Sequence, residues 1–276
     1  MKPEHSMRNM FTAMLVVIAM TATMSAQDAT YRYEDGKEYK YLIEETGLTI
    51  QEVPGRTVNI NTESTITSVL TLLEKLDNGH QRLKMTIESA LVISENPRET
   101  NTFGGDAAGK SVSYEIDNTG DLVDVDTTIR DMDNESRSIL MGAANVLPSF
   151  DAARIDDEEW TVEEVDTTGE GESQIIRESE TTYQVKGMKE VNGYNCHEIS
   201  IETETESDGK LVRGDQEMML SGTQEGKGTV YYSAEKGLLI KMEFEVNGDQ
   251  TIMFPSNNMR IPVTSNQVAK VELLGE

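Results

Sequence analysis

After about Lys37, hydrophobic and polar residues alternate along most of the chain, with Gly, Asn and Asp between the alternating runs. A strand with one buried face has this period of two, whereas an amphipathic helix has a period near 3.6. Two runs at residues 58–72 and 83–87 are separated by Asp77-Asn78-Gly79, which predicts a hairpin with an Asn-Gly turn. We expect further strands at residues 174–188, 194–206, 215–222, 227–234, 237–247 and 261–274.

Two segments depart from this alternation. Residues 95–110 are polar and contain glycine, which predicts a loop. Residues 129–146 have hydrophobic side chains at helical spacing, which predicts one helix with Thr128 as its N-cap, Asp131 three residues on and Pro148 after its end. The predicted apolar face consists of Ile129, Met132, Ile139, Leu140, Ala143 and Val146. A helix of this kind is expected to cover or fill a curved sheet.

Two blocks of sequence recur in the same order along the chain. Residues 78–89, NGHQRLKMTIES, resemble residues 192–203, NGYNCHEISIET. Residues 113–126, SYEIDNTGDLVDVD, resemble residues 229–243, TVYYSAEKGLLIKME, and the glycine recurs whereas most of the aspartates do not. We therefore expect one mainly β domain, 38–276, built of two related halves at about 38–148 and 149–276.

Composition narrows the class of protein. The chain has 276 residues, and 37% of them are hydrophobic, which is enough to bury a core. Its 50 acidic and 24 basic residues give a formal charge of −26. This charge argues against nucleic acid as a partner, because such binding depends on Lys and Arg that displace counterions. An acidic surface is also typical of a soluble protein in a salty or extracellular medium.

The first residues have the features of a secretory signal peptide. Lys2 and Arg8 precede the apolar run MFTAMLVVIAM and the small residues TATMSA, which predicts cleavage after Ala26 and a polar leader at 27–37. The run is too short to span a bilayer comfortably, and no second long apolar run follows, so no transmembrane anchor is expected in the mature chain. No cysteine lies near the cleavage site, which argues against a lipoprotein. We expect a periplasmic or extracellular protein.

Residues that could carry catalysis are few. Cys196 is the one cysteine, and His80 and His197 are the histidines of the predicted mature chain. Cys196 and His197 are adjacent, but neighbours in a strand point to opposite faces, so they are not expected to form a thiol–imidazole pair or share a metal ion. We expect Cys196 to be a buried free thiol, with intermolecular pairing as the alternative, and His80 to be exposed beside its turn. The sequence predicts no catalytic residue, no metal site and no cofactor.

The acidic stretch 113–126 raises the question of a calcium loop. Such a loop places oxygen ligands at positions 1, 3, 5 and 12 and glycine at position 6, whereas Gly120 is the fourth residue from Asp117. Asp124 and Asp126 could hold an ion loosely, but a solvated strand face explains them equally well. Other acidic pairs are too numerous to indicate a site, and one Trp and five Phe leave few sugar platforms, so a glycosidase-like hydrolase is disfavoured.

The signal peptide, the hairpin at 117–123, the step Leu147-Pro148 and Trp160 together resemble exported bacterial proteins of unknown function near the lipoprotein-carrier (LolA-like) superfamily. Tyr231 to Leu239 also has the late Tyr-x-x-x-x-x-Gly-Leu-Leu form of that group. The chain departs from the group at residues 157–160, Asp-Glu-Glu-Trp, where Gly-Asp-x-Trp is common. We expect Trp160 to be a core anchor, with a ligand platform as the alternative.

The resemblance implies a strongly curved, half-open antiparallel barrel with about one or two helices packed in its concave face. It carries over no functional residue. The leading hypothesis is a non-enzymatic protein that binds a lipid or other apolar ligand, or an envelope protein, in that face. The alternative is a structural or protein-interaction module with a filled core. Methionines that could line either a cavity or a core are Met85, Met218, Met219, Met242 and Met253.

Overall fold

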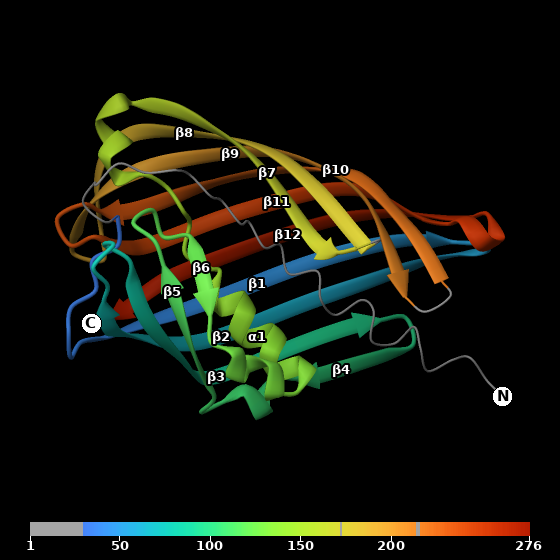
Figure 1. The fold of residues 1–276 in the computed structure, drawn as a ribbon, viewed down its shortest axis with the longest axis horizontal. Coiled ribbons are helices and arrows are strands. Elements are labelled where there is room, and N and C mark those ends of the chain that lie inside the picture. The colour runs from blue at the N-terminus through green and yellow to red at the C-terminus, as the bar shows by residue number, and fades with distance from the viewer. Residues whose placement is uncertain (1–29, 172, 214–215) are drawn as a thin grey trace.

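A single antiparallel sheet of twelve strands dominates the computed structural model, which describes residues 30–171, 173–213 and 216–276. Its strand order is β6-β5-β3-β2-β1-β12-β11-β10-β9-β8-β7, and β4 pairs with β3 beside this path. The sheet is strongly curved, and its edges do not pair with each other (Figure 1). The predicted fold class, a curved half-open barrel, is confirmed.

The strands are β1 (Glu38–Val53), β2 (Arg56–Lys75), β3 (Gln81–Asn96), β4 (Glu99–Phe103), β5 (Ser111–Ile116), β6 (Leu122–Val125), β7 (Glu159–Glu170), β8 (Ser173–Val191), β9 (Tyr194–Arg213), β10 (Gln216–Ser233), β11 (Leu238–Phe254) and β12 (Met259–Gly275). The helical elements are the α-helix α1 (Asn134–Ala144) and the short 3-10 turns η1 (Gly105–Ala107), η2 (Thr127–Asp131), η3 (Ala152–Asp157) and η4 (Pro255–Asn257). None of these described helices is long and apolar enough to cross a bilayer.

Chain connectivity explains how the concave face is covered. Most consecutive strands are neighbours, and β12 pairs with β1. The long crossing runs from β6 at one edge to β7 at the other through η2, α1 and η3 (Figure 1). The helix α1 contacts η1, β3 and β5, so it covers the concave face near the β5–β6 edge. This placement agrees with the expected helix in the concave face.

The core lies where the concave face meets this crossing. Alternating residues of the long strands form a row of cross-strand partners, Ile199, Val230, Met242, Val271, Ile43 and Ile66, on β9, β10, β11, β12, β1 and β2. Five of the six are buried, and Met242 packs against them half-buried. The period-two pattern therefore identified the buried face correctly.

Tyrosine is the dominant large residue of this core. Seven of the nine tyrosines are fully buried: Tyr31, Tyr33, Tyr39, Tyr41, Tyr114, Tyr183 and Tyr232. A buried phenol needs a hydrogen-bond partner, and several of these hydroxyls donate to main-chain carbonyls of segments that lie inside the sheet. Tyr31 donates to Pro148 at 2.6 Å, and Tyr183 donates to Ser149 at 2.9 Å. The hydroxyls therefore fix the position of the crossing segment.

The N-terminal part of the described chain lies in the same core. The sequence placed residues 27–37 in a polar leader, but Thr30, Tyr31 and Tyr33 are buried. The Thr30 main chain donates to Asn118 at 2.7 Å and accepts from the Tyr232 hydroxyl. Tyr31 and Tyr33 alone are too short an alternation to predict a strand, so the sequence did not indicate that they are buried. The predicted signal peptide, 1–26, and residues 27–29 lie outside the described residues.

The predicted helix is present but shorter than expected. Residues 127–131 form the 3-10 turn η2, in which Ile129 is buried, and α1 begins only after Asp133. Asp133 is the N-cap in place of Thr128, and its carboxylate accepts from the Ser136 N–H at 2.8 Å. The Thr128 N–H instead donates to Asp126. The apolar spacing identified the buried face, whereas the choice among several capping residues depended on the preceding turn.

Strand boundaries also differ at two places. Residues 95–110 were expected to be a loop, but Glu99–Phe103 pairs with β3 as β4. The predicted strands 215–222 and 227–234 are one strand, β10. Gly226 and Gly228 do not interrupt it, because the ring of Phe244 lies where a Cβ atom at either position would be. These glycines make room for an aromatic side chain of the neighbouring strand rather than for a turn.

Replacing Gly120 with alanine should destabilise the protein more than the same change at Gly193. Both glycines have positive φ, +99° and +81°, which costs a non-glycine residue about 1–2 kcal/mol. A Cβ atom at Gly120 would also overlap the Tyr31 ring, whereas the space at Gly193 is open. We expect a further loss of about 1–3 kcal/mol for Gly120→Ala from overpacking. Urea unfolding of the two variants measures the difference, and equal losses would contradict the packing of Tyr31 on this turn.

Alkaline pH should unfold the protein as the buried tyrosines ionise. Burial raises the pKa of Tyr232 to about 12 and raises the pKa values of Tyr31 and Tyr33 well above their usual value. The unfolded chain ionises near pH 10, so the stabilisation is complete below about pH 10 and is lost as the pH rises further. Ultraviolet titration should show the buried tyrosines ionising together with loss of circular dichroism. In guanidinium all nine should ionise near pH 10, and gradual ionisation of the folded protein would contradict the burial.

Candidate functional site

The concave face continues beyond the core along the far halves of the long strands. On β9 the buried Ile199 and Ile201 are followed on the same face by Thr203, Thr205 and Ser207. On β8 and β12 polar side chains, Thr181 and Gln267, lie at the level of Thr203, whereas Val246 of β11 lies at that level and belongs to the core. We call this surface the polar belt and define it as Ser179, Thr181, Thr203, Thr205, Ser207, Gln224, Gln250, Ser265, Gln267, Thr49 and Gln51.

Glutamines of the polar belt lie over glycines of neighbouring strands. A Cβ atom at Gly222 would meet Cγ of Gln250 at 2.7 Å, and one at Gly248 would meet Cγ of Gln224 at 3.1 Å. Gln267 lies over Gly47 in the same way, at 3.4 Å. The glycines leave room for each glutamine stem to lie along the sheet. Six belt side chains are buried: Gln51, Thr181, Thr203, Ser207, Gln250 and Ser265. The hydroxyls of Thr181 and Thr203 share a hydrogen bond at 3.0 Å.

An apolar row follows the polar belt towards the ends of the strands. Leu220, Ile252 and Ile261 are direct cross-strand partners on β10, β11 and β12. Ile175 on β8 continues the row across Gly209 of β9, which pairs with both Ile175 and Leu220. We call Ile175, Leu220, Ile252 and Ile261 the apolar rim. It lies outside the main core cluster, and the polar belt between core and rim also contains the buried Val263, the cross-strand partner of Gln250 and Gln51.

One half-buried carboxyl, that of Glu45, lies at the border between core and belt. Glu45 pairs with Ala269 and Ser64, and the Ser64 hydroxyl donates to it at 3.1 Å. Burial raises the pKa of Glu45, and the hydrogen bond from Ser64 partly opposes this shift.

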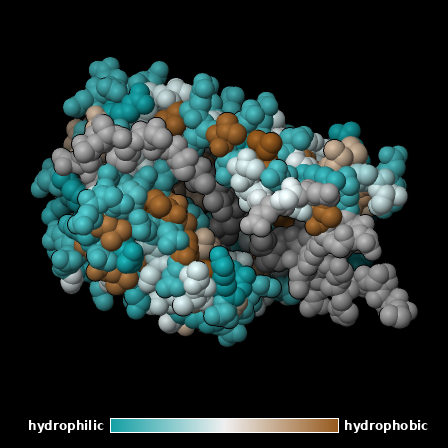
Figure 2. Space-filling model, in the orientation of Figure 1, coloured by the Kyte–Doolittle hydropathy of each residue, from teal (hydrophilic) through white to brown (hydrophobic). Residues whose placement is uncertain are grey.

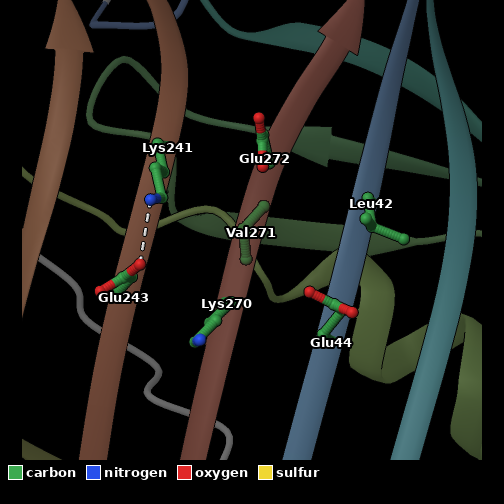
Figure 3. A pocket seen from close by; sticks show the side chains of 7 residues that line it. All are labelled: Leu42, Glu44, Lys241, Glu243, Lys270, Val271 and Glu272. Atoms are coloured by element: carbon green, nitrogen blue, oxygen red, sulfur yellow. Dashed lines mark ion pairs between the residues drawn. The ribbon is translucent and has the colours of Figure 1, made fainter. Parts of the chain in front are cut away.

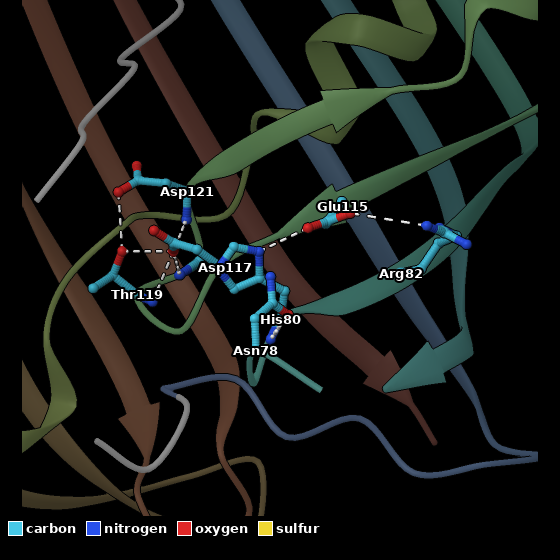
Figure 4. A network of polar contacts seen from close by, with 8 residues as sticks. Asn78, His80, Arg82, Glu115, Asp117, Thr119 and Asp121 are labelled. Atoms are coloured by element: carbon cyan, nitrogen blue, oxygen red, sulfur yellow. Dashed lines mark hydrogen bonds and ion pairs between the residues drawn. The ribbon is translucent and has the colours of Figure 1, made fainter. Parts of the chain in front are cut away.

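The acidic stretch 113–126 forms a turn. One oxygen of Asp117 accepts from the main-chain N–H groups of Thr119 at 2.8 Å and of Gly120 and Asp121 at 3.0 Å (Figure 4). Asp124 and Asp126 are exposed, and Asp126 caps η2. Across the described ranges, no three His, Cys, Asp or Glu side chains come together as a metal site. Asp117 thus stabilises the β5–β6 turn.

Cys196 and His197 are consecutive residues of β9. Cys196 is fully buried and its Sγ donates to the Tyr194 carbonyl at 3.5 Å, while His197 is half-buried. Burial raises the pKa of the Cys196 thiol to about 11, which keeps it protonated at neutral pH and unsuited to nucleophilic attack. The expected buried free thiol is confirmed.

His80 is more enclosed than the sequence indicated. Its Nδ1 lies 2.7 Å from the Glu115 carboxylate of β5, and Arg82 lies 3.9 Å from the other oxygen of Glu115 (Figure 4). The pairing of β3 with β5 creates this contact, which the turn sequence alone could not show. The arrangement links a turn to the next strand.

Trp160 and the five methionines have different surroundings. Trp160 is buried and stacks on Tyr183 with ring centres 5.0 Å apart, as expected of a core anchor. Met85 is in the core, and Met242 packs against it. Met218 is buried at the far end of the sheet, whereas Met219 and Met253 are exposed there. The methionines therefore do not line one shared cavity.

A surface hollow lies on the convex side of the sheet. Its volume is about 180 Å³, and its lining residues are Leu42, Glu44, Lys241, Glu243, Lys270, Val271 and Glu272 (Figure 3). Lys241 and Glu243 form an ion pair at 3.0 Å within it. Its mixed charges largely satisfy one another, so it offers no clear preference for a ligand. The polar belt and apolar rim are the stronger candidate site.

Sequence reasoning did not identify this site, although a signal was present. The run ISIETETES at 199–207 keeps the alternation of β9 while its inward positions change from Ile to Thr and Ser. The change alone could not be distinguished from a strand leaving the core. Only the register of the neighbouring strands shows that several strands change at the same level.

Comparisons with known proteins give little further information. No protein-family model matches the chain, and no curated protein sequence matches it. Among solved structures, a mutant of Rh. blastica porin has 9% identity and a TM-score of 0.24, covering 84% of this chain and 100% of that chain. A DUF1329 family protein from Desulfovibrio piger ATCC 29098 has 12% identity and a TM-score of 0.15, covering 88% of each chain. At these scores neither similarity supports an argument about function.

Proposed function

We propose that the chain is a non-enzymatic protein, exported to the periplasm or the cell exterior, that binds an amphiphilic ligand along the open half of its concave face. The observation that carries this proposal is the succession of polar belt and apolar rim along the same strands. An acyl chain on the rim gains about 0.8 kcal/mol for each buried CH₂ group. The headgroup exchanges hydrogen bonds with the hydroxyls and amides of the belt. Placement near the lipoprotein-carrier superfamily fits the same proposal.

The closed half of the concave face is excluded as the site of binding. Tyr31 and Tyr33 fill it from the N-terminal segment, and Phe150 fills it from the crossing segment. The ring centres of Tyr31 and Phe150 are 6.3 Å apart. A ligand there would have to displace side chains that form the core. The proposed ligand therefore lies on the belt and rim.

An entirely apolar ligand fits the open half less well than an amphiphile. Burying the belt amides and hydroxyls against hydrocarbon would remove their hydrogen-bond partners, which costs about 1–3 kcal/mol for each group. A headgroup that hydrogen-bonds avoids this penalty. The proposal therefore narrows the expected ligand from lipids in general to amphiphiles with a polar headgroup.

A structural or protein-interaction module is the second candidate. The filled closed half supports it, because the core is complete without any ligand. In this case the polar belt would contact an envelope protein through hydrogen bonds. Ligand binding by the mature chain distinguishes the two candidates.

An acidic residue at the apolar rim should weaken ligand binding, whereas the same change on the opposite face should not. Ile252 and Met253 are consecutive in β11, and Ile252 faces the rim while Met253 faces the convex side. We expect Ile252→Asp to bind a monomeric lysophospholipid with a fluorescent acyl chain at least about tenfold more weakly, a loss of about 1.4 kcal/mol. Fluorescence titration of residues 27–276 measures the affinity, and Met253→Asp is the control.

Three results decide between the candidates. If Ile252→Asp binds the lysophospholipid more weakly than Met253→Asp does, and both unfold in urea as the wild type does, the result supports binding at the rim. Equal affinity of both variants would place the ligand elsewhere and overturn the site. A folded wild-type chain that binds no lysophospholipid, and that carries no lipid in native mass spectrometry, would favour the interaction module.

A further inference from the structure

The convex side carries a second apolar feature at the same end of the strands. Lys210, Met219, Met253 and Arg260 are successive cross-strand partners on β9, β10, β11 and β12. Met219 is 44% exposed and Met253 is 36% exposed. Two neighbouring methionines thus lie in solvent with a cationic side chain on either side.

Further exposed hydrophobic side chains surround this row. Ile176 of β8 and Val212 of β9 are 44% and 36% exposed. Together with Met219 and Met253 they make up four of the ten large hydrophobic residues that are exposed in the described chain, so exposure is concentrated at this end. We call Ile176, Val212, Met219 and Met253 the apolar tip. It lies towards the β11–β12 turn, at the right of Figure 1.

The apolar tip and the apolar rim make the same strand ends hydrophobic on both faces. Ile175 and Ile176 point to opposite sides of β8, and Ile252 and Met253 point to opposite sides of β11. An antiparallel sheet usually has one polar face where it meets water. Elsewhere the visible described surface is mostly hydrophilic (Figure 2). The exposed apolar surface at this end lies on the convex side, since Ile261 of the rim is buried and no rim residue is among the exposed large hydrophobic residues of the described chain.

The charges beside the apolar tip balance one another: Lys210 and Arg260 flank the two methionines, and Asp208 and Glu217 are the cross-strand partners of Ile176 and Val212. The chain has a formal charge of −26, yet the Met219–Met253 pair has Lys210 and Arg260 on its two sides. Lys210 pairs with Glu217 at 3.0 Å, whereas Arg260 donates to the Thr251 hydroxyl at 3.4 Å and makes no ion pair with the described residues. Cations beside an apolar patch complement the phosphate layer above an acyl boundary.

We propose that the apolar tip docks on the surface of a phospholipid bilayer. Methionine is unbranched and adapts to an irregular acyl boundary, and the long stems of Lys210 and Arg260 let their charges remain among the phosphates. Lys210 neutralises Glu217 beside the tip at 3.0 Å, and carboxylates more than about 8 Å away are largely screened at physiological salt. The proposal does not depend on the proposed ligand.

Flotation with lipid vesicles tests this docking. Residues 27–276 are mixed with vesicles of phosphatidylcholine, or of phosphatidylcholine with one fifth phosphatidylglycerol, and floated on a density gradient. We expect the wild-type chain to float with both kinds of vesicle. The double variant Met219→Asp/Met253→Asp should have a vesicle-bound fraction at least about tenfold smaller. The matched control is Met188→Asp/Leu274→Asp, which changes two exposed hydrophobic residues away from the tip by the same charge.

The control variant should float as the wild type does. Arg260→Glu should weaken binding further for vesicles with phosphatidylglycerol than for phosphatidylcholine alone, because its charge acts on the anionic headgroups. Urea unfolding shows that each variant is folded. A wild-type chain that floats with neither vesicle, or tip and control variants that lose binding equally, would overturn the proposal. The wild-type chain could also self-associate without floating, and the tip variant could abolish that self-association. This result would assign the tip to a contact between protein chains and would overturn the membrane proposal as well.

Discussion

The structure depends on hydrogen bonds from buried tyrosine hydroxyls to main-chain carbonyls. A half-open barrel must cover its concave face. Here irregular segments cover it, and their main-chain groups lie outside the regular strand pairing of the sheet. Tyr31 and Tyr183 donate to the carbonyls of Pro148 and Ser149, and Tyr232 donates to that of Thr30. Each phenol contributes a large apolar ring to the core and satisfies a polar group that would otherwise be buried without a partner. Leucine or phenylalanine would supply only the first.

This arrangement divides the sheet into two functional halves. Where the crossing and N-terminal segments lie, the concave face is a filled core. Where they end, the strands continue, and glycines leave room for the stems of Gln224, Gln250 and Gln267 to lie along the sheet. The same strands thus supply the stability of the protein at one end and a candidate binding surface at the other. A change in the open half should therefore affect binding more than folding.

The apolar rim and the apolar tip lie on opposite faces of the same strand ends. If both proposals hold, an amphiphile would pass between a bilayer and the rim without crossing water, because the tip would hold the strand ends at the acyl boundary. The polar belt would then receive the headgroup. The ligand proposal depends on the rim on the concave side, and the membrane proposal depends on the tip on the convex side. Either proposal can therefore be wrong while the other holds.

The sequence by itself determined the class of fold and the buried face of most strands. Alternation along Ile199, Ile201 and their neighbours follows from the geometry of a strand, in which successive side chains point to opposite faces. The Asn-Gly turns and the helix near Ile139 and Leu140 were likewise local signals. The N-cap at Asp133 and the continuity of β10 were not, because each depends on a contact outside its own segment.

Only the tertiary structure decided what the open half presents. Thr205 and Ser207 are ordinary polar residues in the sequence. They become part of a belt because the register pairs Thr205 with Gln224 of β10 and aligns Ser207, across Gly222, with Gln250 of β11. Met219 and Met253 become a pair for the same reason. Register joins residues that are far apart in the chain, and no local pattern records it. The sequence therefore determined which side chains face inward, and the pairing of strands determined which of them act together.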